Sequence, residues 1–135
     1  MAGADIELCE YLEDEGTFTV GATDGTGIFA GELPAGVING AALTLYPGSP
    51  PEHNLKKTGM TLEMPRLQLT VRNTVEATAI TKAQDAAKAL SKIANQTIEG
   101  TRFRSVTVLQ TPGLLYRDAS NRPVYGCNIA CEREI

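Results

Sequence analysis

The sequence has 135 residues, of which 42% are hydrophobic and 21% are charged, and this composition is typical of a single globular domain spanning 1–135. Its formal net charge of −4 and its 5% aromatic content, without tryptophan, argue against nucleic-acid binding as the main task, because phosphate contacts need a basic surface and base stacking needs aromatic rings. The stretch 1–16 lacks the parts of a signal peptide, and no apolar run reaches the ~20 residues that a membrane helix needs, so we expect no membrane partner and folding in a reducing cytosol.

A short helix is predicted over residues 4–15, ending before Gly16. Ile6, Cys9 and Leu12, with Leu8 beside them, recur at helical spacing and form its apolar stripe. The other positions are acidic: Glu7, Glu10, Glu13, Asp14 and Glu15. Because no histidine accompanies these carboxylates, they indicate a solvated acidic face rather than a metal or acid–base site.

Two β-prone pieces follow at 17–20 and 27–31, and the Asp24-Gly25 pair between them predicts a hairpin turn. This glycine-rich stretch does not fit a phosphate-binding loop, which needs a lysine and a hydroxyl residue after its last glycine. Here Ile28 follows Gly27, so we expect no nucleotide cofactor.

A further strand is predicted at 41–48, with Leu43 and Leu45 on one face. It leads into a Pro- and Gly-rich stretch, 47–59, that predicts a loop, and a loop of this length is typical of a functional or mobile segment. The stretch contains four polar side chains of interest: Glu52, His53, Lys56 and Lys57. His53 is the only histidine of the chain, and without a Cys or Ser motif beside it we interpret it as surface rather than as a catalytic group.

The next strand, 62–72, alternates strictly between apolar and polar residues. Leu67, Leu69 and Val71 form its apolar face. Arg66, Gln68, Thr70 and Arg72 form its polar face. The longest helix of the chain is predicted directly after it, at 74–96, with Asn73 and Glu76 as a capping box. Its apolar stripe is rich in small residues: Ile80, Ala83, Ala87, Leu90 and Ala94, with Ala86 and Ile93 at the edges.

Three strands close the chain, at 102–110, 113–118 and 122–134, and the turn residues at 118–123 predict that the last two pair as a hairpin. In the final strand, Tyr125, Cys127, Ile129 and Cys131 share one face. Cys127 and Cys131 lie about 13 Å apart along a strand, which is too far for a disulfide. We interpret these two cysteines and Cys9 as buried small hydrophobes.

Together these elements predict an α+β domain in which a mixed or antiparallel sheet packs against two helices. No Ser/His/Asp or Cys/His arrangement and no metal-ligand spacing occurs in the sequence. We therefore assign no catalytic, cofactor-binding or metal-binding residue.

Four stretches in succession carry a family resemblance: "GIFAGELPAGV", "ALTLYPGSPP", "RLQLTVRN" leading into a helix, and "GLLYRDASNRPVYGCNIACE". Their order and spacing resemble the tail terminator, or tail completion, family of long-tailed bacteriophages, often filed as minor capsid proteins. The resemblance extends from about residue 5 to 133. The chain departs from it in the helix 74–96, which is richer in Ala and Thr, and in its few aromatic residues.

The resemblance implies a structural protein of the virion, located at the tail–neck junction and assembled in the host cytoplasm. Its subunits would form a ring, typically a hexamer, on the head-proximal end of the tail tube. The ring stops addition of the major tail tube protein and offers a surface to the head connector or stopper protein. DNA passes through its lumen without specific binding, and no reaction or cofactor is involved.

Closed rings need two different complementary patches on each subunit, which suggests roles for the charged residues. We expect a subunit interface between a basic set and the acidic first helix; the residues are Arg66, Gln68, Arg72, Arg102 and Arg104 on one side and Glu10 and Glu13 on the other. We expect loop residues to face the tube or the connector: Glu52, His53, Lys56, Lys57, Arg117, Asp118 and Arg122. Alternatively, Arg66 and Arg72 are the solvent face of an edge strand.

Three other functions stay open at this stage. A head-completion protein or connector adaptor of the phage neck differs only in its position in the virion. A small enzyme with a site scattered among ordinary Asp, Glu and Arg residues would show a concave pocket with perturbed carboxylates. A nucleic-acid-binding module would show salt-sensitive DNA binding.

Overall fold

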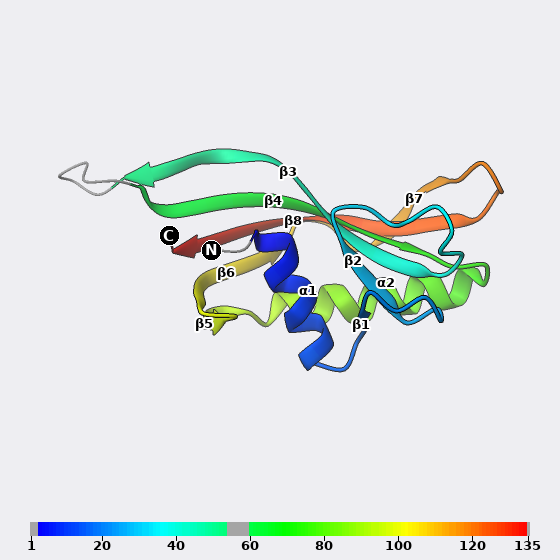
Figure 1. Ribbon diagram of the computed structural model, residues 1–135. Coiled ribbons are helices and arrows are strands. Elements are labelled where there is room, and N and C mark those ends of the chain that lie inside the picture. The colour runs from blue at the N-terminus through cyan, green and yellow to red at the C-terminus, as the bar shows by residue number, and fades with distance from the viewer. Residues whose placement is uncertain (1–2, 54–59, 135) are drawn as a thin grey trace.

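The computed structural model describes residues 3–53 and 60–134 and confirms the predicted α+β class, with two helices and one sheet (Figure 1). The helices are α1 (Ala4–Asp14) and α2 (Glu76–Ser91). The strands are β1 (Thr19–Val20), β2 (Gly27–Ala30), β3 (Gly40–His53), β4 (Met60–Arg72), β5 (Ala94–Ile98), β6 (Thr101–Val108), β7 (Gly113–Arg117) and β8 (Pro123–Glu134).

The sheet has the strand order β1-β2-β3-β4-β8-β6-β5, and β7 pairs with β8 beside β6. The pairings β1–β2 and β2–β3 are parallel, and all the others are antiparallel. The predicted hairpin between the last two strands is confirmed as β7–β8. Both helices lie on the same side of the sheet, so its other face has no helix over it (Figure 1).

The core lies between the sheet and the helices. Leu67, Leu69 and Val71 of β4 are fully buried there, and α2 packs against β4, β6 and β8, as the alternation in the sequence predicted. The Ala-rich stripe of α2 brings that helix close to the strands. At Gly126 of β8 a Cβ atom would lie 1.8 Å from the carbonyl oxygen of Leu69, so the close approach of β8 to β4 requires glycine there.

Helix α1 forms where the sequence predicted it. It ends in a Schellman motif: Gly16 adopts a φ of +78°, the Gly16 N–H donates to the Glu13 carbonyl, and the Thr17 N–H donates to the Leu12 carbonyl. The predicted apolar stripe is wrong at Ile6, which is 49% exposed. The buried face instead contains Ala4, Leu8, Cys9, Tyr11 and Leu12, together with Glu7.

The predicted hairpin over residues 17–31 is wrong, because β1 and β2 pair in parallel, with Thr19 opposite Gly27. The Asp24 carboxylate accepts hydrogen bonds from the backbone N–H and the hydroxyl of Thr26, at 3.1 and 2.5 Å. After this turn, β2 begins beside the start of β1, since the Thr19 N–H donates to the Thr26 carbonyl. The two strands therefore run in the same direction. Turn residues alone therefore indicated a reversal but not the strand direction.

The predicted loop at 47–59 is also wrong in its extent. Strand β3 continues to His53 and β4 begins at Met60, so Glu52 and His53 belong to a strand. The prolines misled the prediction: the β3–β4 register shifts around Ser49 and Glu52, and prolines are tolerated at such irregularities. Lys56 and Lys57 lie outside the described residues, as do the side chains of 47–53.

The predicted helix 74–96 is too long at its end, and strand β5 was missed. Helix α2 stops at Ser91, and β5 pairs with β6 through a tight turn in which Glu99 and Gly100 have φ values of +49° and +80°. Ala94 is accordingly an exposed strand residue rather than part of the apolar stripe. The predicted capping box does not form: Asn73 accepts a hydrogen bond from the Val75 N–H, and Glu76 accepts one from the Tyr125 hydroxyl.

Candidate functional site

The face of the sheet without helices carries the polar side chains that the alternation in β4 predicted. Arg66, Gln68 and Thr70 lie there half-buried, flanked by polar residues of β8 and β6. Within the described residues, two hollows lie on this face. Since its side chains are polar and no helix lies over it, we treat it as one candidate contact surface.

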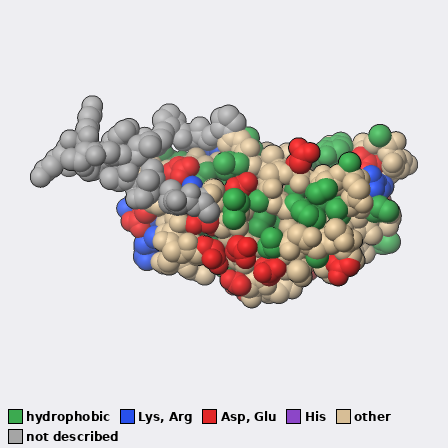
Figure 2. Space-filling model, in the orientation of Figure 1, with side chains coloured by type: hydrophobic (Ala, Val, Ile, Leu, Met, Phe, Trp, Pro, Cys, Tyr) green, Lys and Arg blue, Asp and Glu red, His purple; other side chains and the backbone are tan. Residues whose placement is uncertain are grey.

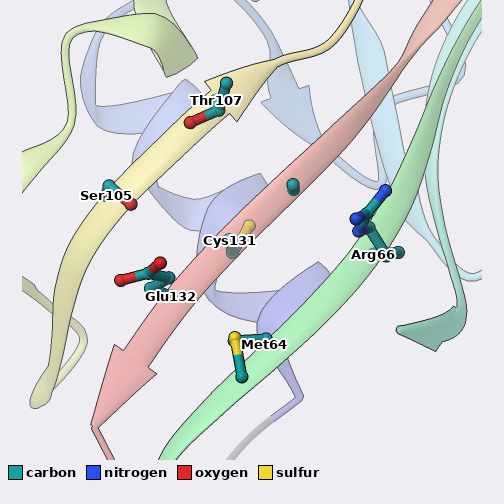
Figure 3. A pocket seen from close by; sticks show the side chains of 7 residues that line it. Met64, Arg66, Ser105, Thr107, Cys131 and Glu132 are labelled. Atoms are coloured by element: carbon teal, nitrogen blue, oxygen red, sulfur yellow. The ribbon is translucent and has the colours of Figure 1, made fainter. Parts of the chain in front are cut away.

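The first hollow has a volume of about 130 Å³ and lies across β4, β8 and β6 (Figure 3). Its lining comprises Met64, Arg66, Ser105, Thr107, Ala130, Cys131 and Glu132. Within the described part of the chain, no hydrogen-bond or ion-pair partner is found for the Arg66 guanidinium. A half-buried cation without a partner is suited to a carboxylate from another protein.

The second hollow, of about 190 Å³, lies toward the other end of β4, where Arg72 and Tyr116 contribute to its lining. Arg72 is fixed inside its own subunit. Its guanidinium donates to the carbonyls of Ile38 and Pro34 at 3.4 and 3.3 Å, and to that of Val37, and lies 3.8 Å from the Asp118 carboxylate. Burial, followed by the nearby Arg122 charge, lowers the pKa of Arg72. Arg72 thus anchors the 34–38 loop, which leaves it little capacity for a neighbouring subunit.

The three residues predicted at the tip of the β7–β8 hairpin, Arg117, Asp118 and Arg122, have different surroundings. Asp118 forms an ion pair with Arg122 at 2.7 Å, and its carboxylate also accepts hydrogen bonds from the backbone N–H groups of Ser120 and Arg122. Burial opposes ionisation of Asp118, but these bonds and the Arg122 charge outweigh it and lower the pKa of Asp118. Arg117 is different: it is half-exposed, and its 3.7 Å ion pair with the equally exposed Glu76 is weak. Arg117 also donates to the Asn121 carbonyl at 3.3 Å. Of the three predicted residues it is the most exposed, and therefore the one most open to a partner.

Charge is divided between the two sides of the sheet. The basic side lies beyond β8 and contains Arg102 and Arg104 on β6 and Arg117 on β7. Arg102 and Arg104 share one carboxylate, that of Glu134, at 3.7 and 3.6 Å, so a net positive charge remains.

The acidic side lies next to β1–β3, against which α1 packs, and contains Glu10, Glu13 and Glu32. Acidic side chains gather over α1 in Figure 2. Glu13 also accepts the Val20 N–H at 2.7 Å, which joins α1 to β1. Of the predicted sets, Arg102 and Arg104 lie on the opposite side of the sheet from Glu10 and Glu13, whereas Arg66, Gln68 and Arg72 lie on the central strand β4.

A buried ionic cluster was missed by the sequence analysis, which placed Glu7 on a solvated face. The Arg133 guanidinium bonds to the Glu7 carboxylate and, at 2.9 Å, to that of Glu63, and the Thr101 hydroxyl donates to Glu7. Glu7 and Arg133 are buried. The sequence did contain a signal that both residues are buried: Glu7 lies at helical spacing between Ala4 and Tyr11, and Arg133 shares a strand face with Ile129 and Cys131, two residues apart in each step. This cluster ties α1 to the last strand.

The three cysteines are free and buried, as predicted. Burial raises the pKa of Cys9 and Cys131 to about 12 and that of Cys127 to about 11. Such thiols are poor nucleophiles. Among the described residues, no group of three His, Cys, Asp or Glu side chains is arranged to hold a metal ion. In the same part of the chain, neither helix is long and apolar enough to cross a membrane.

Comparison with known proteins identifies the family. The sequence profile described as "Bacteriophage tail terminator protein" matches residues 11–135, so the chain belongs to this family. Membership places it among structural tail proteins of bacteriophages, a class without enzymatic function.

A solved structure titled "Virion of native gene transfer agent (GTA) particle" contains a chain with the same fold, at a TM-score of 0.65 and 17% identity. The match covers 98% of this chain and 95% of that one. No curated protein matches the sequence.

Proposed function

We propose that this protein forms a ring of identical subunits, most simply a hexamer, that caps the head-proximal end of the tail tube. The ring stops addition of the major tail tube protein and offers its free surface to the head connector or stopper protein. The observation that carries this proposal is family membership over residues 11–135. The protein then resides at the tail–neck junction of the virion, after assembly in the host cytoplasm.

The division of charge supports a cyclic assembly. A ring has a heterologous interface in which one side of each subunit meets the opposite side of the next. The basic side, with Arg102, Arg104 and Arg117, and the acidic side, with Glu10 and Glu13, are complementary in this sense. Charge of this kind sets the register of neighbours more than their affinity.

Arg66 and Gln68 have another role in this proposal. They lie in the middle of the helix-free face, away from both sides of the sheet. They are therefore better placed to contact the tube or the head than a ring neighbour. DNA passes through the lumen without specific binding, and the formal net charge of −4 is consistent with this because few counterion-releasing contacts are available.

The test is to add the purified protein to polymerising tail tube protein and to image the products by negative stain, with light scattering on the free protein. We expect shorter tubes with a ring at one end, and a ring mass near six times 14.4 kDa. A free monomer is compatible with the proposal if tube ends assemble the ring. Tubes of unchanged length with bare ends would refute it.

A further inference from the structure

The helix-free face of the sheet carries an arginine that the fold leaves unpaired. Every other arginine of the chain lies within 3.8 Å of a carboxylate. Arg66 of β4 is half-buried, yet within the described residues its guanidinium has no hydrogen-bond or ion-pair partner. A half-buried cation has lost part of its hydration, and a carboxylate compensates that loss best because it can accept two parallel N–H bonds from the guanidinium.

The hollow beside Arg66 exists because a small residue occupies the strand next to it. Ala130 of β8 pairs with Arg66 of β4 on one side and with Thr107 of β6 on the other. Its methyl group fills little of the space between these two longer side chains, which leaves the hollow of about 130 Å³. The hydroxyls of Ser105 and Thr107 line the same hollow, so it offers hydrogen-bond donors in addition to the guanidinium.

Glu132 limits where a carboxylate can bind in this hollow. Its side chain lies on the β6 side of β8, whereas Arg66 lies on β4, and these two described residues form no ion pair (Figure 3). A carboxylate over the β6 half of the hollow would be repelled by Glu132, and one over the β4 half would be attracted by Arg66. The hollow therefore selects an acidic group at its β4 end.

Two amide side chains extend this polar surface along the strands. Gln68 and Asn128 lie opposite each other in register, two residues along from Arg66 and Ala130. Both are half-buried, and among the described residues neither side-chain amide has a hydrogen-bond partner. Each amide can both donate and accept, so the pair can bond to the polar groups that flank an acidic side chain in another protein.

A protein fits these groups better than DNA does. A row of phosphates along the face would meet Glu132 as well as Arg66, and one arginine provides few counterion-releasing contacts. All the residues that line the hollow belong to one subunit, so a single copy can bind its partner before a ring closes. Assembly on the end of a tube requires such a site, whereas a head connector meets a ring that is already complete.

We propose that the helix-free face binds the end of the tail tube, and that an acidic side chain of the tail tube protein pairs with Arg66 in the hollow beside Ala130. The inference deepens the proposed function and rests on it. It adds the chemistry of the contact, which is a carboxylate at Arg66 with polar groups over Gln68 and Asn128. Each subunit of a ring contributes the same site, so the ring holds the tube end through several linked contacts that reinforce one another.

Charge reversal tests the carboxylate. We expect Arg66→Glu to raise the protein concentration that caps half of the purified tail tubes by about tenfold or more, because the new charge repels the acidic partner. Lys88→Glu makes the same change of charge on the exposed face of α2 and should cap normally. Glu132→Gln should cap as well as the wild type or better, since it removes a charge that repels the bound carboxylate. Normal capping by Arg66→Glu, or an equal loss in Glu132→Gln, would overturn the inference.

The same variants are compared by light scattering and urea unfolding. We expect Arg66→Glu to keep the oligomeric state and the unfolding midpoint of the wild type, because Arg66 bonds to no described residue of its own subunit. Changing the acidic partner on the tube protein to arginine should restore capping by Arg66→Glu, which identifies the bound side chain. Tubes that Arg66→Glu caps but that no longer join heads would assign this face to the head connector, which overturns the inference and leaves the proposed function intact. Absence of both rings and tube capping in the unmodified protein would defeat the proposed function and the inference together.

Discussion

Two arginine–glutamate clusters lie one residue apart at the end of β8, on opposite faces of the sheet. Arg133 points to the helices and binds Glu7 and Glu63, with side chains of Arg133 and Glu7 that are 5% and 2% exposed. Glu134 points to the helix-free face and is shared by Arg102 and Arg104, whose side chains are 49% and 51% exposed. The chemical groups are the same, and their surroundings differ completely.

The difference determines what each cluster can do. In the buried cluster the charges have lost water, so removal of one partner leaves an uncompensated charge in the core. In the exposed cluster water solvates each group, so the ion pairs contribute little to folding and can be exchanged for pairs with another protein. The first cluster holds the subunit together, and the second is available for assembly.

Replacing Arg133 should break the buried cluster and should lower the free energy of unfolding more than the other substitutions proposed below. We expect Arg133→Met to lower the free energy of unfolding by about 3–5 kcal/mol, because the Glu7 carboxylate stays buried without its cation. Urea unfolding at pH 7 measures this change. The double variant Glu7→Leu with Arg133→Met should recover most of the loss, since both buried charges are then gone. A loss below about 1 kcal/mol in the single variant would show that the cluster is solvated.

The protein should lose stability at alkaline pH, because three thiols are buried from water on the helix-facing side of the molecule. The pKa values of Cys9, Cys127 and Cys131 are raised from 9.0 to about 11–12 by burial, so the protonated thiols are favoured in the folded state. This contribution to stability is complete below pH 9 and is lost as pH rises from 9 toward 11–12. We expect a loss of roughly 1 kcal/mol per thiol for each pH unit above 9.

Unfolding curves between pH 8 and pH 10.5 test this expectation. A variant with all three cysteines replaced by alanine is the control, and its stability should fall less steeply over the same range. Equal slopes for the two proteins would show that the thiols exchange with solvent.

The contrast between the clusters also shows what could be predicted from the sequence. Alternation in β4 revealed both faces of the sheet, because the side-chain period of a strand is visible in one segment. It assigned Leu67 to the core and Arg66 to the open face, and the structure agrees. The pairing of distant residues could not be predicted: Glu7 and Arg133 are 126 positions apart and meet only in the folded sheet, where α1 packs beside β1, β2 and β3.

Strand pairing was the other limit. The sequence marked a turn at Asp24-Gly25, but whether β1 and β2 run parallel depends on what lies beside them, and α1 supplies a contact there through Glu13 and Val20. Which strands end the sheet, β1 and β5, could not be predicted for the same reason. An edge is defined by the strands that do not pair with it, and no local pattern records that.

Asp118 lies between the two extremes, since it is largely covered yet belongs to a surface hairpin. Asp118→Asn should loosen the β7–β8 turn, because the amide cannot form the ion pairs with Arg122 and Arg72. Hydrogen exchange of the Arg122 amide should become several-fold faster, while core amides of β4 stay protected. The lowered pKa of Asp118 predicts that acid loosens the wild-type turn as pH falls below the ordinary carboxyl range. Unchanged exchange in the variant would show that backbone bonds alone hold the turn.

The exposed cluster should give the smallest effect on folding and a clear effect on assembly. We expect Arg102→Ala and Arg104→Ala each to change the free energy of unfolding by about 0.5 kcal/mol or less, because half-exposed ion pairs to one shared carboxylate are screened by water and salt. If this cluster serves the ring, the same variants should assemble more slowly, and the difference from wild type should fade as salt is raised. Loss of stability with normal assembly would reverse the comparison, because Glu134 would then act in the fold as Glu7 does. Retained stability with slowed assembly would show that the helix-free face of β8, at Glu134, serves assembly. The neighbouring residue Arg133, on the helix side, would then serve folding.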